Sequence, residues 1–194
     1  PDIGHISIFR NRGAAAGATR SHPHSQILAT PFVPTAVAGE VARADAFHRS
    51  AGRPLLDAMV EYERDRGDRV VFENEDVFVF CPFASRFPFE TWIVPRHSGS
   101  HFDSATGTQL DAVADALRDL MWVVARAIEG PSYNVMVATA PSSVEDAPGY
   151  RWHLRLMPRL SRFAGFEIAS SDFINPTEPA LAAARLRESL EELP

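Results

Sequence analysis

Residues 5–28 read HISIFRNRGAAAGATRSHPHSQIL, and this stretch decides the expected fold. Its first part, His5–Asn11, alternates apolar and polar side chains, which predicts a strand. Gly13–Thr19 follows as a loop of glycine and other small residues, whose backbone N–H groups can approach an anion closely. A strand followed by such a loop predicts a phosphate-binding turn.

The SHPHSQ block at residues 21–26 places His22, His24 and Gln26 at every second position. If this segment is a strand, the three side chains share one face. A neutral imidazole is a good nucleophile at physiological pH, so the pattern is consistent with attack on a phosphorus atom. The same spacing is also typical of metal ligands and of ordinary polar strands, so the block alone leaves these alternatives open.

Residues 9–34, FRNRGAAAGATRSHPHSQILATPFVP, resemble the active-site segment of the galactose-1-phosphate uridylyltransferase family, a branch of the histidine-triad superfamily. The resemblance continues in CPFASRFPFETWIVPRH (81–97), YRWHLRLMPRL (150–160) and AGFEIASSDFIN (164–175), so it covers nearly the whole chain. It implies an α+β fold in which helices pack on a histidine-triad-like antiparallel sheet. It also implies a nucleotidyltransferase that acts on nucleotide sugars.

The resemblance assigns catalytic roles to His24 and Gln26. It implies that His24 takes a nucleoside monophosphate from a nucleotide sugar as a covalent adduct and passes it to a sugar 1-phosphate or to phosphate. Hydrolases of the superfamily carry a third histidine in place of Gln26. A carboxamide cannot exchange a proton with a leaving group but can donate a hydrogen bond to a phosphoryl oxygen, which favours transfer over hydrolysis.

Four further residues match substrate contacts of the family. Asn11, Gly17 and Thr19 match its nucleotide-phosphate contacts. Glu167 matches a carboxylate that binds sugar hydroxyls from the neighbouring subunit, which implies a homodimer. The residues also have structural interpretations, in which Asn11 ends a strand, Gly17 only makes a turn and Glu167 is a solvated strand residue.

A structural zinc ion in some family members is held by an amino-terminal cysteine pair and two histidines, the second of which matches His22. The single cysteine of this chain, Cys81, has no C-x-x-C partner. Zinc at His22 therefore requires ligands from sequence upstream of residue 1. Cys81 lies in the apolar pattern VFVFCPF, and we expect a buried thiol in a reducing compartment.

A second metal site of the family uses one glutamate and three histidines. Glu40 and His153 match two of these ligands, whereas Thr139 and Arg155 stand at the other two positions. Two ligands of four do not define a metal site. We expect Arg155 either to pair with an acidic neighbour such as Glu40 or to lie at the surface without a specific contact.

The HSQ at residues 24–26 differs from the HGQ that is common in uridylyltransferases. Together with the missing metal ligands, this makes the chain similar to the divergent branch that includes ADP-glucose phosphorylase. Three alternatives to uridylyl transfer stay open: phosphorolysis of ADP-glucose or of a dinucleoside polyphosphate, an inactive nucleotide-binding or dimerisation module, and metal-dependent hydrolysis.

Composition excludes several other classes of protein. All 19 basic residues are arginine, and the absence of lysine excludes a Walker-type phosphate loop and a Schiff-base enzyme. A net charge of -6 argues against a general nucleic-acid binder. The sequence shows no amino-terminal signal and no apolar span, so we expect a cytoplasmic location and no membrane partner.

The chain begins at Pro1 and enters almost at once into the strand before the active loop, so we expect a fragment of a protein with two histidine-triad repeats. Residues 1–66 would hold the end of an incomplete first repeat with its connecting helices, and residues 67–194 the second repeat. An internal echo agrees with this division, because HISIFRN, loop and HPHSQIL recur as YNVMVAT, loop and RWHLRLM.

The remaining elements follow from hydrophobic periodicity. Helical spacing predicts helices over residues 36–49, 54–66 and 108–129. A last helix is expected to be capped by Thr177, to carry Pro179 in its first turn and to run through Leu190. Runs rich in Val, Phe and Ile predict strands over residues 69–73, 76–82, 89–95, 133–139, 151–158 and 163–169.

Overall fold

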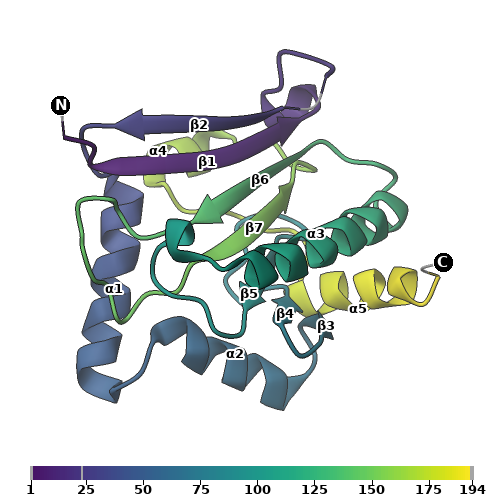
Figure 1. Ribbon diagram of the computed structural model, residues 1–194. Helices are drawn as coiled ribbons and strands as arrows, with labels where there is room; N and C mark the ends of the chain where they lie inside the picture. Colours follow the sequence, from purple (N-terminus) through teal and green to yellow (C-terminus); the bar gives the residue numbers. More distant parts are fainter. Residues whose placement is uncertain (1, 23, 193–194) are drawn as a thin grey trace.

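The structure is a computed structural model that describes residues 2–22 and 24–192. The seven strands of this part of the chain form one antiparallel sheet with the order β2-β1-β6-β7-β5-β4-β3 (Figure 1). They are β1 (His5–Arg12), β2 (Ser25–Thr30), β3 (Val70–Glu73), β4 (Val77–Phe80), β5 (Thr91–Pro95), β6 (Tyr133–Ala138) and β7 (His153–Pro158). The predicted α+β class is confirmed.

Helices pack on this sheet from several sides. The α-helices are α1 (Thr35–Ala51), α2 (Leu55–Arg66), α3 (Gly107–Ala127), α4 (Gly165–Ser170) and α5 (Pro179–Leu190). Two short 3-10 turns are η1 (Ala14–Ala16) and η2 (Phe102–Ser104). In Figure 1, α3 and α5 lie side by side in front of the sheet, and α1 runs along its left edge.

The main core lies between the sheet and the pair α3 and α5. Leu120 of α3 and Leu186 of α5 are fully buried against Val79, Ile93 and Leu156 from three neighbouring strands. Strand side chains alternate between faces, so residues 154 and 156 of β7 enter this core while residues 153 and 155 face the other side of the sheet. That other face also carries Gln26 and Asn11, two of the predicted site residues.

The opposite face is covered in part by α1 and α2. Leu56 of α2 packs with Phe78, Phe80 and Val94 in a second buried cluster. These strand residues alternate with the ones in the main core, so the middle of the sheet is buried on both faces.

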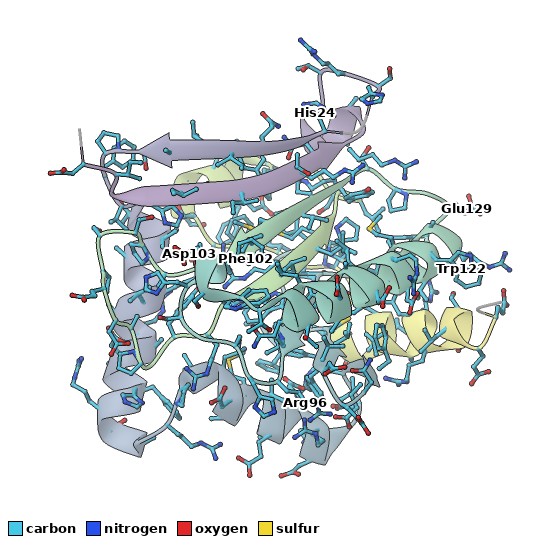
Figure 2. The ribbon with its side chains drawn as sticks, viewed as in Figure 1. His24, Arg96, Phe102, Asp103, Trp122 and Glu129 are labelled. Atoms are coloured by element: carbon cyan, nitrogen blue, oxygen red, sulfur yellow. The ribbon has the colours of Figure 1, made fainter. Side chains whose placement is uncertain are left out.

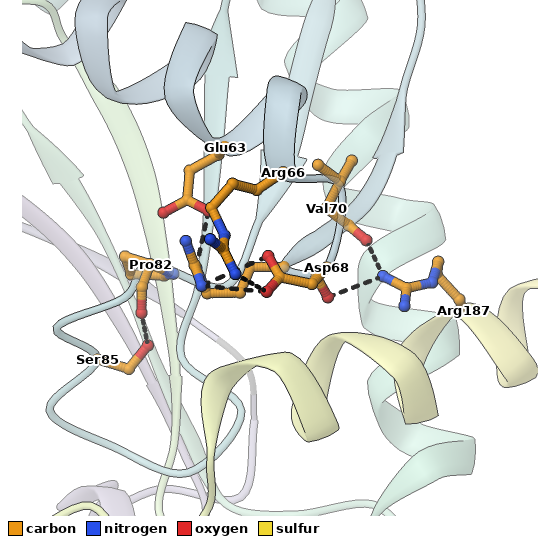
Figure 3. Close-up of polar contacts among 8 residues, drawn as sticks. Glu63, Arg66, Asp68, Val70, Pro82, Ser85 and Arg187 are labelled. Atoms are coloured by element: carbon orange, nitrogen blue, oxygen red, sulfur yellow. Dashed lines mark hydrogen bonds and ion pairs between the residues drawn. The ribbon is translucent and has the colours of Figure 1, made fainter.

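An ion pair and two backbone contacts fix the junction between α2, β3 and α5 (Figure 3). Arg69 Nε donates to Glu63 Oε2 at 2.7 Å, and both side chains are buried. Arg187 of α5 donates to the carbonyl oxygens of Asp68 and Val70. The last helix is therefore attached to the start of the edge strand β3 by hydrogen bonds as well as by apolar packing.

Most predicted elements are confirmed with shifts of at most two residues at their ends, but two predictions in the carboxy-terminal part are wrong. Residues 163–169 do not form a strand, because α4 occupies Gly165–Ser170. Glu167 stabilises the start of this helix by accepting the N–H of Ala164 at 2.9 Å. Thr177 does not cap α5, whose N-cap residue is Glu178.

Cys81 directly follows β4 and is fully buried, as expected. Burial raises the pKa of its thiol to about 12, so the group is un-ionised at physiological pH and is a poor nucleophile. Within residues 2–22 and 24–192, no helix combines the length and the apolar content that crossing a membrane requires.

Candidate active site

The hairpin of β1 and β2 places the histidine block at one end of the sheet. Phe9 pairs with Gln26 across the two strands, so Gln26 lies on the same face as Phe9 and as Asn11 two residues further on. Strand β2 begins only at Ser25, so the predicted strand through His22 and His24 is wrong. His22 lies in a bend and His24 directly precedes β2.

Pro23, which the alternate spacing would place on the opposite face, lies outside the described residues. Because His22 and His24 precede β2, strand alternation does not place them on one face with Gln26. A local hydrogen bond orients His24 instead.

His24 Nδ1 lies 3.0 Å from the carbonyl oxygen of His22. A carbonyl oxygen only accepts, so the proton of the imidazole must sit on Nδ1 and the lone pair on Nε2. The imidazole is half-buried, and Figure 2 shows it at the loop end of the hairpin, away from the helices α3 and α5. This arrangement leaves the unprotonated Nε2 of His24 at an accessible end of the sheet.

The small-residue loop is shaped by two glycines. Gly13 and Gly17 flank η1 with φ of 80° and 78°, a conformation that side-chain-bearing residues rarely adopt. Inside the loop, the N–H groups of Ala16 and Ala18 donate to the Gly13 carbonyl, and the N–H of Gly17 donates to that of Ala14. Because these three N–H groups are bonded within the loop, fewer backbone donors than expected are available to bind an anion.

A cavity of about 340 Å³ lies beside this loop. Two of the predicted substrate-binding residues, Asn11 and Thr19, line it together with Arg12 and Arg20. Gly17 is not among its lining residues, and its observed role is the turn that ends η1. The two arginines supply positive charge that suits a phosphate-bearing ligand.

Asn11 is held by a residue that the sequence analysis missed. Asn134 of β6 pairs with Asn11 across the strands, and its Nδ2 donates to Asn11 Oδ1 at 2.8 Å and to the Ala16 carbonyl at 3.0 Å. With its oxygen engaged, Asn11 keeps its own Nδ2 available as a donor. No local pattern in the sequence identifies Asn134, because its contact with Asn11 depends on the pairing of two distant strands.

Glu167 lies apart from this cavity on α4, where its exposed carboxylate accepts the N–H of Ala164. That hydrogen bond lowers the pKa of Glu167, so the carboxylate is charged at neutral pH. The structure therefore groups Asn11 and Thr19 around one cavity and does not bring Glu167 into it.

His22 has an exposed side chain, and its carbonyl supports His24. In the described part of the chain, no three side chains of His, Cys, Asp or Glu come close enough to hold a metal ion. The residues present around His22 therefore do not by themselves form a zinc site.

Glu40 and His153, the two residues that match the second metal site, do come together, around Arg155. Arg155 Nη1 and Nη2 donate to the two carboxylate oxygens of Glu40 at 2.8 and 2.9 Å, and Nε donates to His153 Nε2 at 2.9 Å. Arg155 is 8% exposed, so the expected pairing with Glu40 is confirmed and the surface alternative is wrong. Thr139 faces elsewhere and accepts the N–H of Phe102 at 2.9 Å.

The charges of this cluster are strongly coupled. Burial, with a smaller effect of the Arg155 charge, lowers the pKa of His153 to about 3, so the imidazole is neutral. Burial acts to raise the pKa of Glu40, but the hydrogen bonds and charge of Arg155 outweigh it and the pKa lies below its ordinary value. The cluster therefore holds one guanidinium and one carboxylate over a wide pH range.

The sheet and its histidine hairpin can be compared with those of known proteins. A family model described as the amino-terminal domain of galactose-1-phosphate uridyl transferase matches residues 2–34. A solved structure of uridylyltransferase superimposes with a TM-score of 0.90 and 28% identity, covering 99% of this chain and 62% of that one. The chain is thus related to the galactose-1-phosphate uridylyltransferase family.

Two relatives narrow this relationship. ADP-glucose phosphorylase of Arabidopsis thaliana is 33% identical over 188 residues, which are 96% of this chain and 52% of that protein. Its crystal structure with bound ADP-glucose superimposes with a TM-score of 0.87 and 32% identity, covering 96% of this chain and 58% of that one. A probable galactose-1-phosphate uridylyltransferase of Drosophila melanogaster is 32% identical over 94% of this chain and 55% of that protein. The chain spans about half the length of the curated relatives it matches.

Proposed function

We propose that the protein transfers a nucleoside monophosphate between a nucleotide sugar and a sugar 1-phosphate. In the first step, His24 Nε2 attacks the α-phosphorus, a P–N bond forms, and the P–O bond to the β-phosphoryl group breaks. The sugar 1-phosphate leaves with the bridging oxygen and its electron pair. In the second step, a phosphate oxygen of the acceptor attacks the same phosphorus and the P–N bond breaks.

The contact between His24 Nδ1 and the His22 carbonyl is the observation that supports this proposal. It fixes the tautomer in which Nε2 carries the lone pair, and it stabilises the positive charge that develops on the ring as the P–N bond forms. Buried His153 makes the same Nδ1 contact, but its Nε2 accepts from Arg155, whereas Nε2 of half-buried His24 is accessible for attack.

Gln26 and Asn11 support the transfer as hydrogen-bond donors. They share one face of the hairpin, and the Asn134 contact keeps the Asn11 amide nitrogen available. Donors of this kind stabilise phosphoryl oxygens as their charge increases in the transition state. Neither side chain can donate a proton to water or a leaving group, which agrees with transfer rather than hydrolysis.

Covalent labelling tests the proposal directly. The protein is incubated with ADP-glucose or UDP-glucose labelled at the α-phosphorus and then denatured in alkali, because acid cleaves P–N bonds. We expect label on the wild type and on His97→Ala, whose histidine lies in a turn elsewhere, and none on His24→Ala. Label that persists in His24→Ala would refute His24 as the nucleophile, and absence of label from every form would favour an inactive nucleotide-binding module.

A second candidate function is phosphorolysis of ADP-glucose. The similarity to the Arabidopsis enzyme and the HSQ sequence at residues 24–26 favour it. It uses the same His24 adduct but takes inorganic phosphate as acceptor. Offering the labelled protein phosphate or galactose 1-phosphate in parallel separates the two functions, because ADP or UDP forms only with phosphate and a nucleotide sugar only with the sugar phosphate.

We further propose that Glu167 acts in the site of a second subunit. Exposed apolar side chains surround its helix, and an exposed apolar patch of this kind is typical of an interface. They are Leu160, Phe163, Phe166, Ile168 and Ile174. Sedimentation analysis should show a dimer, and Phe166→Asp should shift it toward monomer, whereas Tyr62→Asp on α2 should not.

The division into two repeats is also a proposal, with residues 1–66 ending the first and residues 67–194 forming the second. The equivalent registers of the hairpins β1–β2 and β6–β7 support it, since Phe9 pairs with Gln26 as Met136 pairs with Arg155. A cytoplasmic location is proposed on the buried free thiol of Cys81.

A further inference from the structure

The positions that match the family's second metal site contain a guanidinium group at their centre. Arg155 contacts both remaining ligand candidates, Glu40 and His153, while Thr139 is engaged with Phe102. Glu40 and His153 line a cavity of about 290 Å³, but Arg155 lines it with them and its hydrogen bonds occupy their ligand atoms. The residues present do not fit a metal.

The hydrogen bonds of the cluster use the lone pairs that a metal would need. Both carboxylate oxygens of Glu40 accept from Arg155, and Tyr150 also contacts Oε2 at 3.4 Å. His153 donates from Nδ1 to the Arg151 carbonyl at 2.9 Å and accepts at Nε2 from Arg155. The three nitrogens of the planar Arg155 guanidinium thus donate to three acceptor atoms, two on Glu40 and one on His153. A metal ion would bind the same three atoms as ligands.

Electrostatics also favours the guanidinium over a cation. Arg155 carries a permanent positive charge, and its side chain is 10% exposed. It stacks on the Trp92 ring with 4.4 Å between Cζ and the ring centroid, and the His153 ring lies 4.7 Å from the same centroid. A divalent cation entering this space would meet a buried positive charge that cannot be deprotonated.

Arg155 also connects two parts of the fold. Glu40 belongs to α1, which follows β2 in the chain, whereas His153 and Arg155 belong to β7 in the middle of the sheet. Cross-strand pairs run from Gln26 through Phe9 and Met136 to Arg155, so three strand spacings, roughly 14 Å, separate Gln26 from Arg155. Arg155 is thus outside contact distance of the proposed phosphoryl site.

We propose that Arg155 takes the place of a metal ion in this protein and joins α1 to β7 as a metal-independent structural link. The ion pair with Glu40 and the bond to His153 supply the cross-link that a divalent cation would otherwise make. In Arg155→His, the introduced imidazole would lie on the same face of β7 as His153, two residues along the strand, and close to Glu40. That set has the composition of a transition-metal site.

Metal analysis of the purified protein and of Arg155→His tests this inference without measuring activity. The protein is exposed to excess Co²⁺ and passed through gel filtration. We expect the wild type and His153→Gln to retain the same amount of Co²⁺. We expect Arg155→His to gain about one Co²⁺ per chain, with the visible absorption of a low-coordinate site, and to lose it on addition of His153→Gln. Comparison with the His153→Gln forms excludes metal bound elsewhere, for example near His22.

The wild-type result alone can overturn the proposal. If the wild type holds about one metal ion per chain that disappears in both His153→Gln and Glu40→Gln, Arg155 does not replace a metal. If Arg155→His does not fold, its refolding with and without Co²⁺ replaces the retention assay. Recovery only with Co²⁺ supports the proposal, and failure under both conditions, with Arg155→Lys folded, contradicts it.

Discussion

The hairpins β1–β2 and β6–β7 each hold a histidine whose Nδ1 contacts the carbonyl oxygen two residues earlier, at 3.0 Å for His24 and 2.9 Å for His153. Both imidazoles therefore carry their proton on Nδ1. They differ at Nε2, which is accessible in half-buried His24 and accepts from Arg155 in buried His153. The residue two positions later, Gln26 or Arg155, and the degree of burial separate a candidate nucleophile from a structural histidine.

The largest expected effect comes from removing each imidazole in turn. His24→Ala should reduce nucleotidyl transfer by at least about 10³-fold and change the free energy of unfolding by less than about 0.5 kcal/mol, because the site is at the surface. His153→Ala should leave nucleotidyl transfer nearly unchanged. It should lower the free energy of unfolding by about 2–4 kcal/mol, because it leaves a cavity and an unpaired donor on Arg155. Parallel turnover and urea-unfolding measurements check both.

The comparison fails if the two variants behave alike. If His153→Ala is fully folded under the assay conditions and still loses nucleotidyl transfer, the second hairpin also takes part in catalysis.

The next effect concerns the ion pair that distinguishes the second hairpin. Glu40→Gln and Arg155→Met should each destabilise by about 3–5 kcal/mol, because each leaves a buried charge without its partner. The double variant should lose much less unfolding free energy than the sum of the two single losses, since it leaves no buried charge unpaired. A double-mutant cycle from denaturant unfolding measures the coupling. Additive losses would show that the bidentate contact does not contribute to stability.

A smaller effect should appear in the pH dependence of stability. The pKa of His153 is about 3 in the folded state against 6.5 for the ordinary group, so between these values the unfolded state binds one more proton. Stability should therefore decrease as pH falls below 6.5, by about 2–3 kcal/mol at about pH 4.5. The lowered pKa of Glu40 acts in the same direction at lower pH. His153→Gln should flatten this decrease, whereas His24→Ala should not.

Periodicity was sufficient to predict the sheet and the long helices, because their apolar residues recur with the spacing of the buried face. It failed at residues 163–169, where Phe163 and Phe166 gave an apolar run but a side-chain cap from Glu167 starts a helix. It also failed at His22 and His24, since alternate spacing cannot show where a ladder begins. In α4, the hydrogen bond from the Ala164 N–H to Glu167 outweighed the pattern.

The candidate site was only partly predictable for a related reason. The alternate spacing identified His24 and Gln26 as candidates. The internal repeat in the sequence indicated that β6 and β7 form a second, similar hairpin. The Asn134 contact to Asn11 depends on strand register between residues 123 positions apart, which no local pattern encodes. The Arg155 contact with Glu40 spans 115 positions and was anticipated as one of two alternatives.

The smallest predicted effects concern Gly13 and Gly17 in the first hairpin loop, whose positive φ has no counterpart in the loop between β6 and β7. A Cβ on Gly13 would lie 2.1 Å from Ser132 Oγ, in addition to the strain of a φ of 80°, whereas a Cβ on Gly17 would meet nothing within 4 Å. Gly13→Ala should therefore cost about 2 kcal/mol and Gly17→Ala about 1 kcal/mol, the backbone strain alone. If the nucleotide-phosphate contact assigned to Gly17 is real, Gly17→Ala should also raise the KM for the nucleotide sugar beyond what Gly13→Ala does. An unchanged KM would leave Gly17 with only its role as a turn.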